Sequence, residues 1–141
     1  MANGATNIEL FRKTEGSLQM VVFSRDASHR VGQLSLSVHL LDKNVPIEAT
    51  EVSIHTEGID GEKSISYGTI SAILPIHYDV TVPVTTIGNY NLKTVAKLDE
   101  SIIDGSFIIT ISDTKINWEI IASVLVGVLI VLPVAIIVTR K

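Results

Sequence analysis

The feature that most constrains this chain is a run of nineteen residues, Ile120 to Val138, that contains no charged side chain. As an α-helix rising about 1.5 Å per residue, this run would reach roughly 29 Å, close to the ~30 Å hydrocarbon core of a bilayer. We therefore predict a transmembrane helix over residues 118–139, with residues 140–141 as a basic tail. The lipid bilayer is then one partner of the protein.

Small and kinking residues within this run indicate what the helix packs against. Ser123 and Gly127 lie four positions apart on one helix face, which allows a second helix to approach closely. Pro133 removes a backbone donor, and neighbouring helices commonly accommodate the resulting kink. The pattern favours packing against polytopic integral membrane protein subunits. The alternative is a plain single-pass anchor, in which isolated Gly and Pro residues are ordinary.

The residues that flank the run predict its orientation. Trp118 is expected at the membrane interface, and Arg140 and Lys141 follow the other end, so the positive-inside rule places the C-terminus in the cytoplasm. The head would then be extracytoplasmic, either periplasmic or extracellular. Residues 1–7 have neither the basic nor the apolar region of a signal peptide. A tail-anchored protein with a cytosolic head is therefore the alternative, unless a signal sequence has been removed.

The composition excludes several classes of function. The absence of cysteine excludes a disulfide scaffold, a thiol nucleophile and thiolate metal sites. The net charge is −4, and no basic patch is interleaved with aromatic residues, so we expect no nucleic acid partner. The sequence contains neither a phosphate-binding glycine loop nor a nucleophile elbow. We therefore expect no enzyme activity.

The residues before the anchor alternate between apolar and polar with a period of two, which is typical of half-buried strands. From Leu34 to Leu40, for example, the apolar residues fall on one face and the polar residues on the other. We predict an all-β head over residues 1–112, an immunoglobulin-like antiparallel β-sandwich of seven or eight strands. Residues 113–117 form a short linker to the helix.

Several local signals predict where these strands begin and end. Residues 8–13 and 18–24 resemble an opening strand pair, and 106–112 the last strand. Asp42-Lys43-Asn44 predicts a turn, Pro46 excludes a central strand at its position, and Asp60-Gly61 predicts a hairpin.

The segment Gly88-Asn89-Tyr90 precedes an inward Leu92 and resembles the tyrosine corner of immunoglobulin-like folds. The alternative is a tyrosine that merely starts a strand. The cysteine pair and core tryptophan of antibody domains are missing, so we expect an aliphatic core with Phe and Tyr.

A wider pattern resembles YtkA-like domains and their FixH and CopC-like relatives. It covers roughly residues 31–111. The segments that carry it are the turn at Gly32 with the strand to Leu41, Pro46-Ile47, Ala49-x-x-Val52-x-Ile54, Pro83-Val84 and Gly88-x-Tyr90-x-Leu92. The resemblance implies a small extracytoplasmic immunoglobulin-like sandwich, often tied to the membrane and often found beside copper or oxidase genes. Here the predicted anchor follows the domain, whereas in those relatives it usually precedes it. The chain also resembles the accessory subunits of copper membrane monooxygenases, without their thiolate copper ligand.

Three histidines are candidate metal ligands, since copper accepts imidazole nitrogens. His39, His55 and His77 all fall on the polar phase of their strands, and neighbouring strands can bring two of them within reach. Neither an HxH nor an HxxxH pair occurs, so nothing in the sequence predicts that they converge. His29 and Met20 complete the set of non-carboxylate candidates. The alternative is that all are ordinary surface histidines.

We therefore expect a non-catalytic, single-span accessory subunit of a larger membrane complex, without a cofactor. The linker spans at most about 17 Å, so the head must lie on the bilayer or on a neighbouring protein. A membrane-tethered copper-binding domain is the first alternative, and a tail-anchored cytosolic interaction domain is the second.

Overall fold

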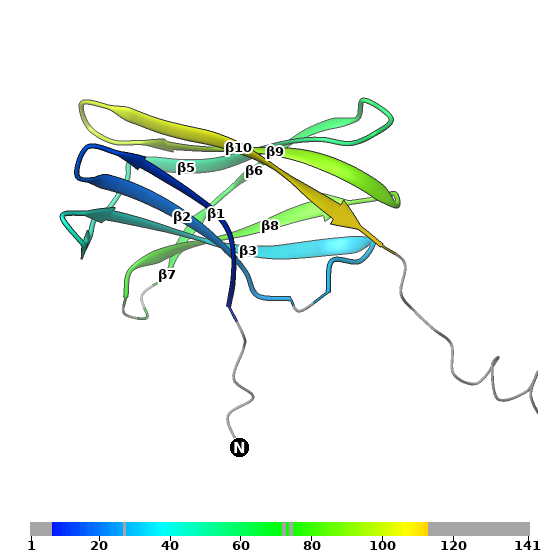
Figure 1. Ribbon diagram of the computed structural model, residues 1–141, viewed down its shortest axis with the longest axis horizontal. Coiled ribbons are helices and arrows are strands. Elements are labelled where there is room, and N and C mark those ends of the chain that lie inside the picture. Colours follow the sequence, from blue (N-terminus) through cyan, green and yellow to red (C-terminus); the bar gives the residue numbers. More distant parts are fainter. Residues whose placement is uncertain (1–6, 27, 72, 74, 113–141) are drawn as a thin grey trace, which may run out of the picture.

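The computed structural model describes residues 7–26, 28–71, 73 and 75–112 (Figure 1). The predicted linker and transmembrane helix therefore lie outside the described residues. So do the candidate residues of that segment, Trp118, Ser123, Gly127, Pro133, Arg140 and Lys141. Within the described ranges, no helix has the length and apolar character needed to cross a membrane. The described residues form two antiparallel sheets that pack face to face, which confirms the all-β prediction.

The first sheet has the order β1-β2-β3-β8-β7, with β4 paired to β3. Its strands are β1 (Ile8–Glu15), β2 (Leu18–Ser24), β3 (Gly32–Asp42), β4 (Val45–Pro46), β7 (Thr69–Ser71) and β8 (His77–Val84). The second sheet has the order β10-β9-β5-β6. Its strands are β5 (Glu51–Glu57), β6 (Lys63–Tyr67), β9 (Gly88–Lys97) and β10 (Ile102–Ile111).

The order of neighbouring strands follows a known pattern. In the first sheet, β2-β3-β8-β7 corresponds to strands A-B-E-D of an immunoglobulin domain, and in the second, β10-β9-β5 corresponds to G-F-C. β1 adds a strand beside β2, and β6 adds one beside β5. The described residues thus form ten strands, more than the predicted seven or eight, because two very short strands, β4 and β7, lie at sheet margins.

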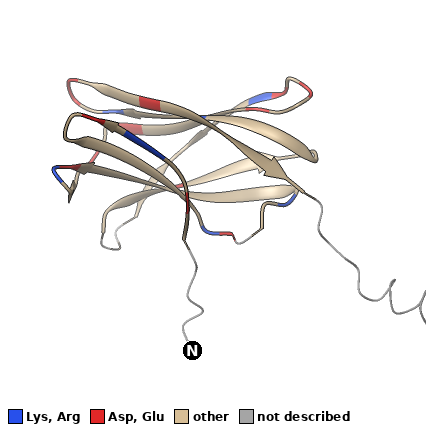
Figure 2. Cartoon of the chain, in the orientation of Figure 1, with Lys and Arg blue, Asp and Glu red and all other residues tan. Residues whose placement is uncertain are grey.

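Alternation along the strands fills the space between the sheets, as the sequence predicts. On β3, β8, β9 and β10 the apolar residues of the inward face are almost completely buried. The core cluster comprises Met20, Val22, Leu34, Leu36, Val38, Leu40, Val52, Ile54, Tyr78, Val80, Val82, Val84, Tyr90, Leu92, Ala96, Ile103, Ile109 and Ile111. Charged residues lie at the turns and at outward-facing positions of the strands (Figure 2). Burial of this apolar surface is the main force that holds the two sheets together.

The predicted turns are confirmed. Lys43 and Asn44 have positive φ angles of 49° and 64° between β3 and β4, and Lys43 N donates to Ser17 O over 3.0 Å. Pro46 lies in the two-residue β4, which pairs only with β3, as expected of a residue that cannot donate to a ladder. The hairpin between β5 and β6 forms at residues 58–62.

Tyr90 forms the predicted tyrosine corner. Its hydroxyl oxygen accepts hydrogen bonds from the backbone N–H groups of Thr85, over 3.1 Å, and Thr86, over 3.0 Å. These part-buried bonds satisfy two backbone donors in the turn from β8 to β9, and they fix that turn against the second sheet. The ring itself is only 4% exposed.

One side of the sandwich is closed by aromatic packing between β1 and β10. The rings of Phe11 and Phe107 are stacked with centroids 5.3 Å apart and planes 13° apart. The Phe11 ring lies directly over Gly105, where a Cβ atom would overlap it. Gly105 therefore allows the two edge strands to approach each other.

Candidate functional site

The register of the first sheet brings polar and aromatic residues together on its outer face. Ser37 pairs with both Phe23 and Asp79, so these residues share one row across β2, β3 and β8. His39 and His77 lie one step further along β3 and β8, on the same face. Arg25 follows the end of β2 and completes a cluster, which we call the histidine cluster: Phe23, Arg25, His39, His77 and Asp79.

The two histidine rings of the cluster are stacked. Their centroids lie 5.1 Å apart, and their planes differ by only 8°. Phe23 contacts His39 edge to face, with centroids 4.9 Å apart and planes at 73°. The Nε2 atom of His39 also lies 3.0 Å from Ser37 Oγ. The His39 ring is thus held by contacts with the rings of Phe23 and His77 and by a hydrogen bond within β3.

Both ring nitrogens of His77 have polar neighbours. Nδ1 lies 2.8 Å from the carbonyl oxygen of Pro75, which can only accept, so Nδ1 donates. Nη2 of Arg25 lies 3.0 Å from Nε2. The same guanidinium forms an ion pair with Asp79, whose carboxylate lies 3.3 Å from His77 Nε2. Arg25 therefore bridges His77 and Asp79.

The environment of His39 favours its neutral form. Burial lowers the pKa of this imidazole below its ordinary value of 6.5, because a charged ring would lose solvation. The neighbouring His77 and Arg25 lower the pKa further by repulsion, while the Asp79 carboxylate raises it.

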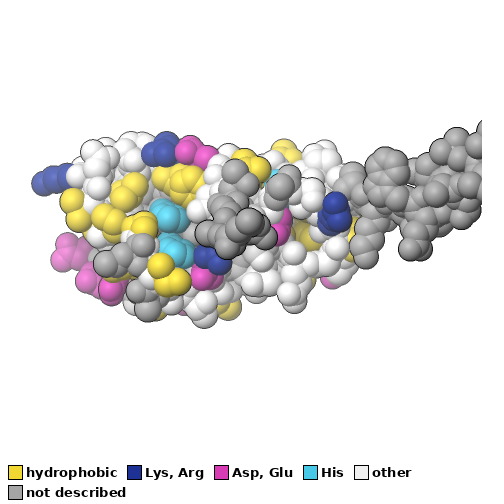
Figure 3. Space-filling model, turned by 90° about the horizontal axis from the view of Figure 1, so that it is seen from below, with side chains coloured by type: hydrophobic (Ala, Val, Ile, Leu, Met, Phe, Trp, Pro, Cys, Tyr) yellow, Lys and Arg dark blue, Asp and Glu magenta, His cyan; other side chains and the backbone are white. Residues whose placement is uncertain are grey.

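Apolar residues surround the cluster on the same face. Val21 pairs with His39 across β2 and β3, and it is 1% exposed although it does not belong to the core between the sheets. We call Val21, Phe23, His39 and His77 the outer patch. Figure 3 views this face and shows two adjoining histidines with hydrophobic side chains beside them. An antiparallel sheet that faces only water is usually polar on that side, whereas here Phe23 and the two histidines are half-buried around the buried Val21.

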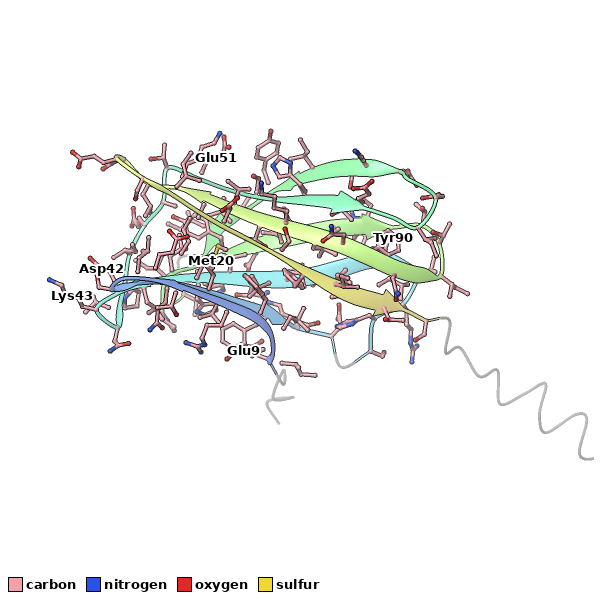
Figure 4. The ribbon with its side chains drawn as sticks, turned by 45° about the horizontal axis from the view of Figure 1, so that its top comes forward. Glu9, Met20, Asp42, Lys43, Glu51 and Tyr90 are labelled. Atoms are coloured by element: carbon pink, nitrogen blue, oxygen red, sulfur yellow. The ribbon has the colours of Figure 1, made fainter. Side chains whose placement is uncertain are left out.

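Charged pairs border the outer patch. The guanidinium of Arg12 on β1 binds Glu9 through two hydrogen bonds of 3.0 Å, and it donates to Gln19 over 3.1 Å. Arg25 and Asp79 form the second pair, with side chains that are 40% and 37% exposed. Figure 4 shows Glu9 on the β1 side of the first sheet.

The predicted metal candidates converge only in part. The structure brings His39 and His77 together but leaves His55 on the outer face of the second sheet, where it pairs with Lys93. His29 lies in the loop after β2, 3.2 Å from Ser24 Oγ. Met20 points between the sheets and is fully buried (Figure 4). Within the described ranges, no group of three or more His, Asp or Glu side chains is arranged to hold a metal ion.

The stacked pair does not fit a single copper ion as it stands. A metal binds in the plane of an imidazole ring, and two parallel planes have no common position for one ion. In addition, the Arg25 guanidinium lies 3.0 Å from His77 Nε2, and its positive charge repels a second cation there. Coordination by both histidines would require one ring to rotate and Arg25 to leave.

Three residues of the site, Phe23, Arg25 and Asp79, escaped the sequence analysis. The sequence of β2 did contain a signal for Phe23. Alternate residues of this strand, from Leu18 to Val22, face inward, so Val21 and Phe23 fall on the outer face, where polar residues are expected. No such signal marked Arg25 or Asp79, whose roles depend on the pairing of β3 with β8.

The comparisons with known proteins bear on the fold. No family model and no curated protein sequence matches the chain. A DUF4426 family protein from Pseudomonas aeruginosa superposes with a TM-score of 0.60 at 15% identity, over 72% of this chain and 96% of that chain. FetP from uropathogenic Escherichia coli, as isolated after expression in the periplasm, superposes with a TM-score of 0.55 at 15% identity, over 76% and 97% of the two chains.

A copper-bound variant of FetP superposes similarly, with a TM-score of 0.54 at 11% identity, over 75% of this chain and 97% of that chain. At these identities the likeness shows a shared fold. The β-sandwich that the YtkA-like resemblance implies is therefore confirmed, whereas membership of that family stays a prediction.

Proposed function

We propose that this chain is a non-catalytic, membrane-tethered accessory subunit with an immunoglobulin-like head on the extracytoplasmic side. In this proposal the head binds a neighbouring integral membrane protein through the outer patch. The observation that carries the proposal is the outer patch itself, an apolar and aromatic cluster on the outer face of a sheet, bordered by charged pairs, in which Phe23 and the two histidines are half-buried over the buried Val21.

The composition of the outer patch suits a protein partner. Contact surfaces between proteins are enriched in aromatic residues and Arg at their centre and are polar at the rim. Phe23 and the stacked histidines supply the aromatic centre, and they are already held in place by their mutual contacts. Little side-chain freedom would be lost on binding, which favours affinity. Arg25 and Asp79 at the rim offer charges of both signs for orienting a partner.

Two observations support the extracytoplasmic location. The basic residues Arg140 and Lys141 follow the predicted span, which favours a cytoplasmic C-terminus. FetP, which shares the fold, was expressed in the periplasm.

Site-specific photo-crosslinking tests the role of the outer patch. A photoreactive residue at position 23 of the full-length chain, in native membranes, should give an adduct with an integral membrane protein. The same residue in place of Ile108, which is 69% exposed on the other sheet, is the matched control. Equal adducts from both positions, or none from position 23, would refute the proposed contact.

The predicted helix contact has its own test. Gly127→Leu should release the chain from its complex in mild detergent, because the larger side chain prevents close helix approach. Ala122→Leu changes the same run without altering the small pair and should leave co-purification intact. Unchanged co-purification of Gly127→Leu would count against packing at this position.

Copper handling is the second candidate function. The observations that favour it are the adjacent imidazoles of His39 and His77, and the copper-bound state of a FetP variant with the same fold. Equilibrium titration of the full-length protein with Cu(I) and Cu(II) distinguishes the candidates. If the protein handles copper, it should bind the ion stoichiometrically. His39→Ala and His77→Ala should each abolish this binding, and His55→Ala should leave it unchanged. Absence of stoichiometric binding at micromolar copper would remove this candidate.

A further inference from the structure

Three exposed apolar side chains lie at the tips of three different loops. Val31 precedes β3 and is 45% exposed, Ile59 lies between β5 and β6 and is 72% exposed, and Ile87 lies between β8 and β9 and is 57% exposed. We call these residues the apolar tips. A single exposed apolar side chain is ordinary, but several that gather at one place can mark a contact site.

The pairing of the strands places all three tips at one end of the sandwich. Gly32 pairs with Val84, so the loops that hold Val31 and Ile87 adjoin. The Ile59 side chain lies beside Gly88, 3.4 Å from where a Cβ of that glycine would be. The turn that Tyr90 fixes lies at this same end (Figure 4).

The chain leaves the sandwich at this end as well. Ile111, the last residue of β10, pairs with Gly88, and the backbone N–H of Ser112 donates to His29 O over 3.0 Å. In Figure 1, β10 ends near the start of β3 and the turn between β8 and β9. The uncharged run begins at Ile120, only a few residues further along the sequence.

The length of the linker, compared with the length of a strand, determines which end of the head faces the predicted span. The five residues 113–117 reach at most about 17 Å, whereas a ten-residue strand such as β10 is about 33 Å long. An upright head thus keeps the end with the apolar tips near the bilayer and holds the opposite end, with the exposed Val45, away from it.

We propose that Val31, Ile59 and Ile87 contact the headgroup region of the lipid bilayer and hold the head upright on it. This inference rests on the membrane span of the proposed function. Apolar side chains that enter the interface gain by leaving water. The partner is thus a lipid surface, reached because the predicted span tethers this end of the sandwich to it.

The charges near the tips favour a zwitterionic surface over a strongly anionic one. Arg30 is exposed next to Val31 and can bind a lipid phosphate. Two carboxylates lie near Ile59 and are held within the turns. Asp60 accepts from the backbone of Glu62 over 3.1 Å, and Glu62 accepts from Thr85 Oγ1 over 3.1 Å.

The absence of cysteine allows a direct test with single labels. Ile87→Cys in the full-length chain is labelled with an environment-sensitive fluorophore and reconstituted into phosphatidylcholine vesicles. The emission should shift to shorter wavelength, and lipids that carry a nitroxide should quench it. Val45→Cys, at the opposite end and 61% exposed in the native protein, is the matched control and should show neither effect.

Flotation of the same vesicles separates the two proposals. Protein that floats with the vesicles but carries a water-exposed, unquenched label at position 87 overturns the contact while keeping the span. Protein that does not float overturns both. A third outcome is a blue shift at position 87 that nitroxide lipids do not quench and that disappears on dilution. This outcome would indicate that the tips contact a second copy of the chain, and it also overturns the lipid contact.

Discussion

Replacing Gly105 by alanine should destabilise the sandwich where β1 meets β10. A Cβ at this position would lie well under 3.0 Å from the ring of Phe11, a separation that real Cβ atoms essentially never show. The ring cannot move aside freely, because it is stacked on Phe107. The substitution therefore forces Phe11 out of its place or pushes the two edge strands apart.

The size of the effect follows from two opposing contributions. Overpacking of a well-filled site costs ~1–3 kcal/mol. Alanine is otherwise better than glycine in a strand by ~0.5–1 kcal/mol, because it loses less backbone freedom on folding. Because the overlap with the Phe11 ring is severe, the upper part of the overpacking range applies, and the net loss in the free energy of unfolding is about 1–2.5 kcal/mol. For a domain of this size, that lowers Tm by roughly 10 °C.

Thermal and urea unfolding of the full-length chain in detergent, followed by far-ultraviolet circular dichroism, measures this loss. The control is the same change in a Phe11→Ala background, where the ring is gone and Gly105→Ala should be neutral or slightly stabilising. The two changes should therefore couple by at least ~1 kcal/mol. Additive effects of the two substitutions would refute the contact between Phe11 and Gly105.

The tyrosine corner and the histidine cluster give further tests. Tyr90→Phe should lower the free energy of unfolding by ~1–3 kcal/mol, because two backbone donors lose their acceptor, whereas Tyr67→Phe on an exposed side chain should change nothing measurable by urea unfolding. Folding lowers the pKa of His39, so the unfolded chain binds the proton more readily, and the free energy of unfolding should fall as the pH drops below about 6.5. His39→Asn should weaken this dependence in urea titrations across pH, and a pH dependence that persists undiminished would contradict the assignment. His55→Asn, at an exposed position on the other sheet, should leave it intact.

Much of the fold could be predicted because it depends on local sequence. The period-two alternation from Leu34 to Leu40 identified the inward face of β3 without knowledge of its neighbours, since a strand places alternate side chains on opposite faces. The turn at Lys43 and Asn44 and the corner at Tyr90 were equally local. Each depends on residues within a few positions of one another.

The candidate site depends on pairing between distant strands, which no local pattern encodes. His39 and His77 are separated by 38 positions and meet only because β3 pairs with β8. His55 is not part of the site because its strand, β5, lies in the other sheet. The alternation of polar and apolar residues around His55 nevertheless resembles that around His39. The bridge from Arg25 to Asp79 requires, in addition, that the residue after β2 fold back over the sheet.

The two proposed surfaces together constrain the partner. The outer patch lies on a sheet face, and the apolar tips lie at the end of the same strands, so a head that stands on the bilayer presents the patch sideways. Phe23 pairs with Ser37, five residues beyond Gly32 along β3, which places position 23 about 17 Å further from the bilayer than the tips. A partner with short loops between its spans cannot reach that height. Adducts formed from position 23 should therefore map to a segment of the partner that projects well above the membrane, and adducts confined to short loops would contradict either the upright head or the contact at the patch.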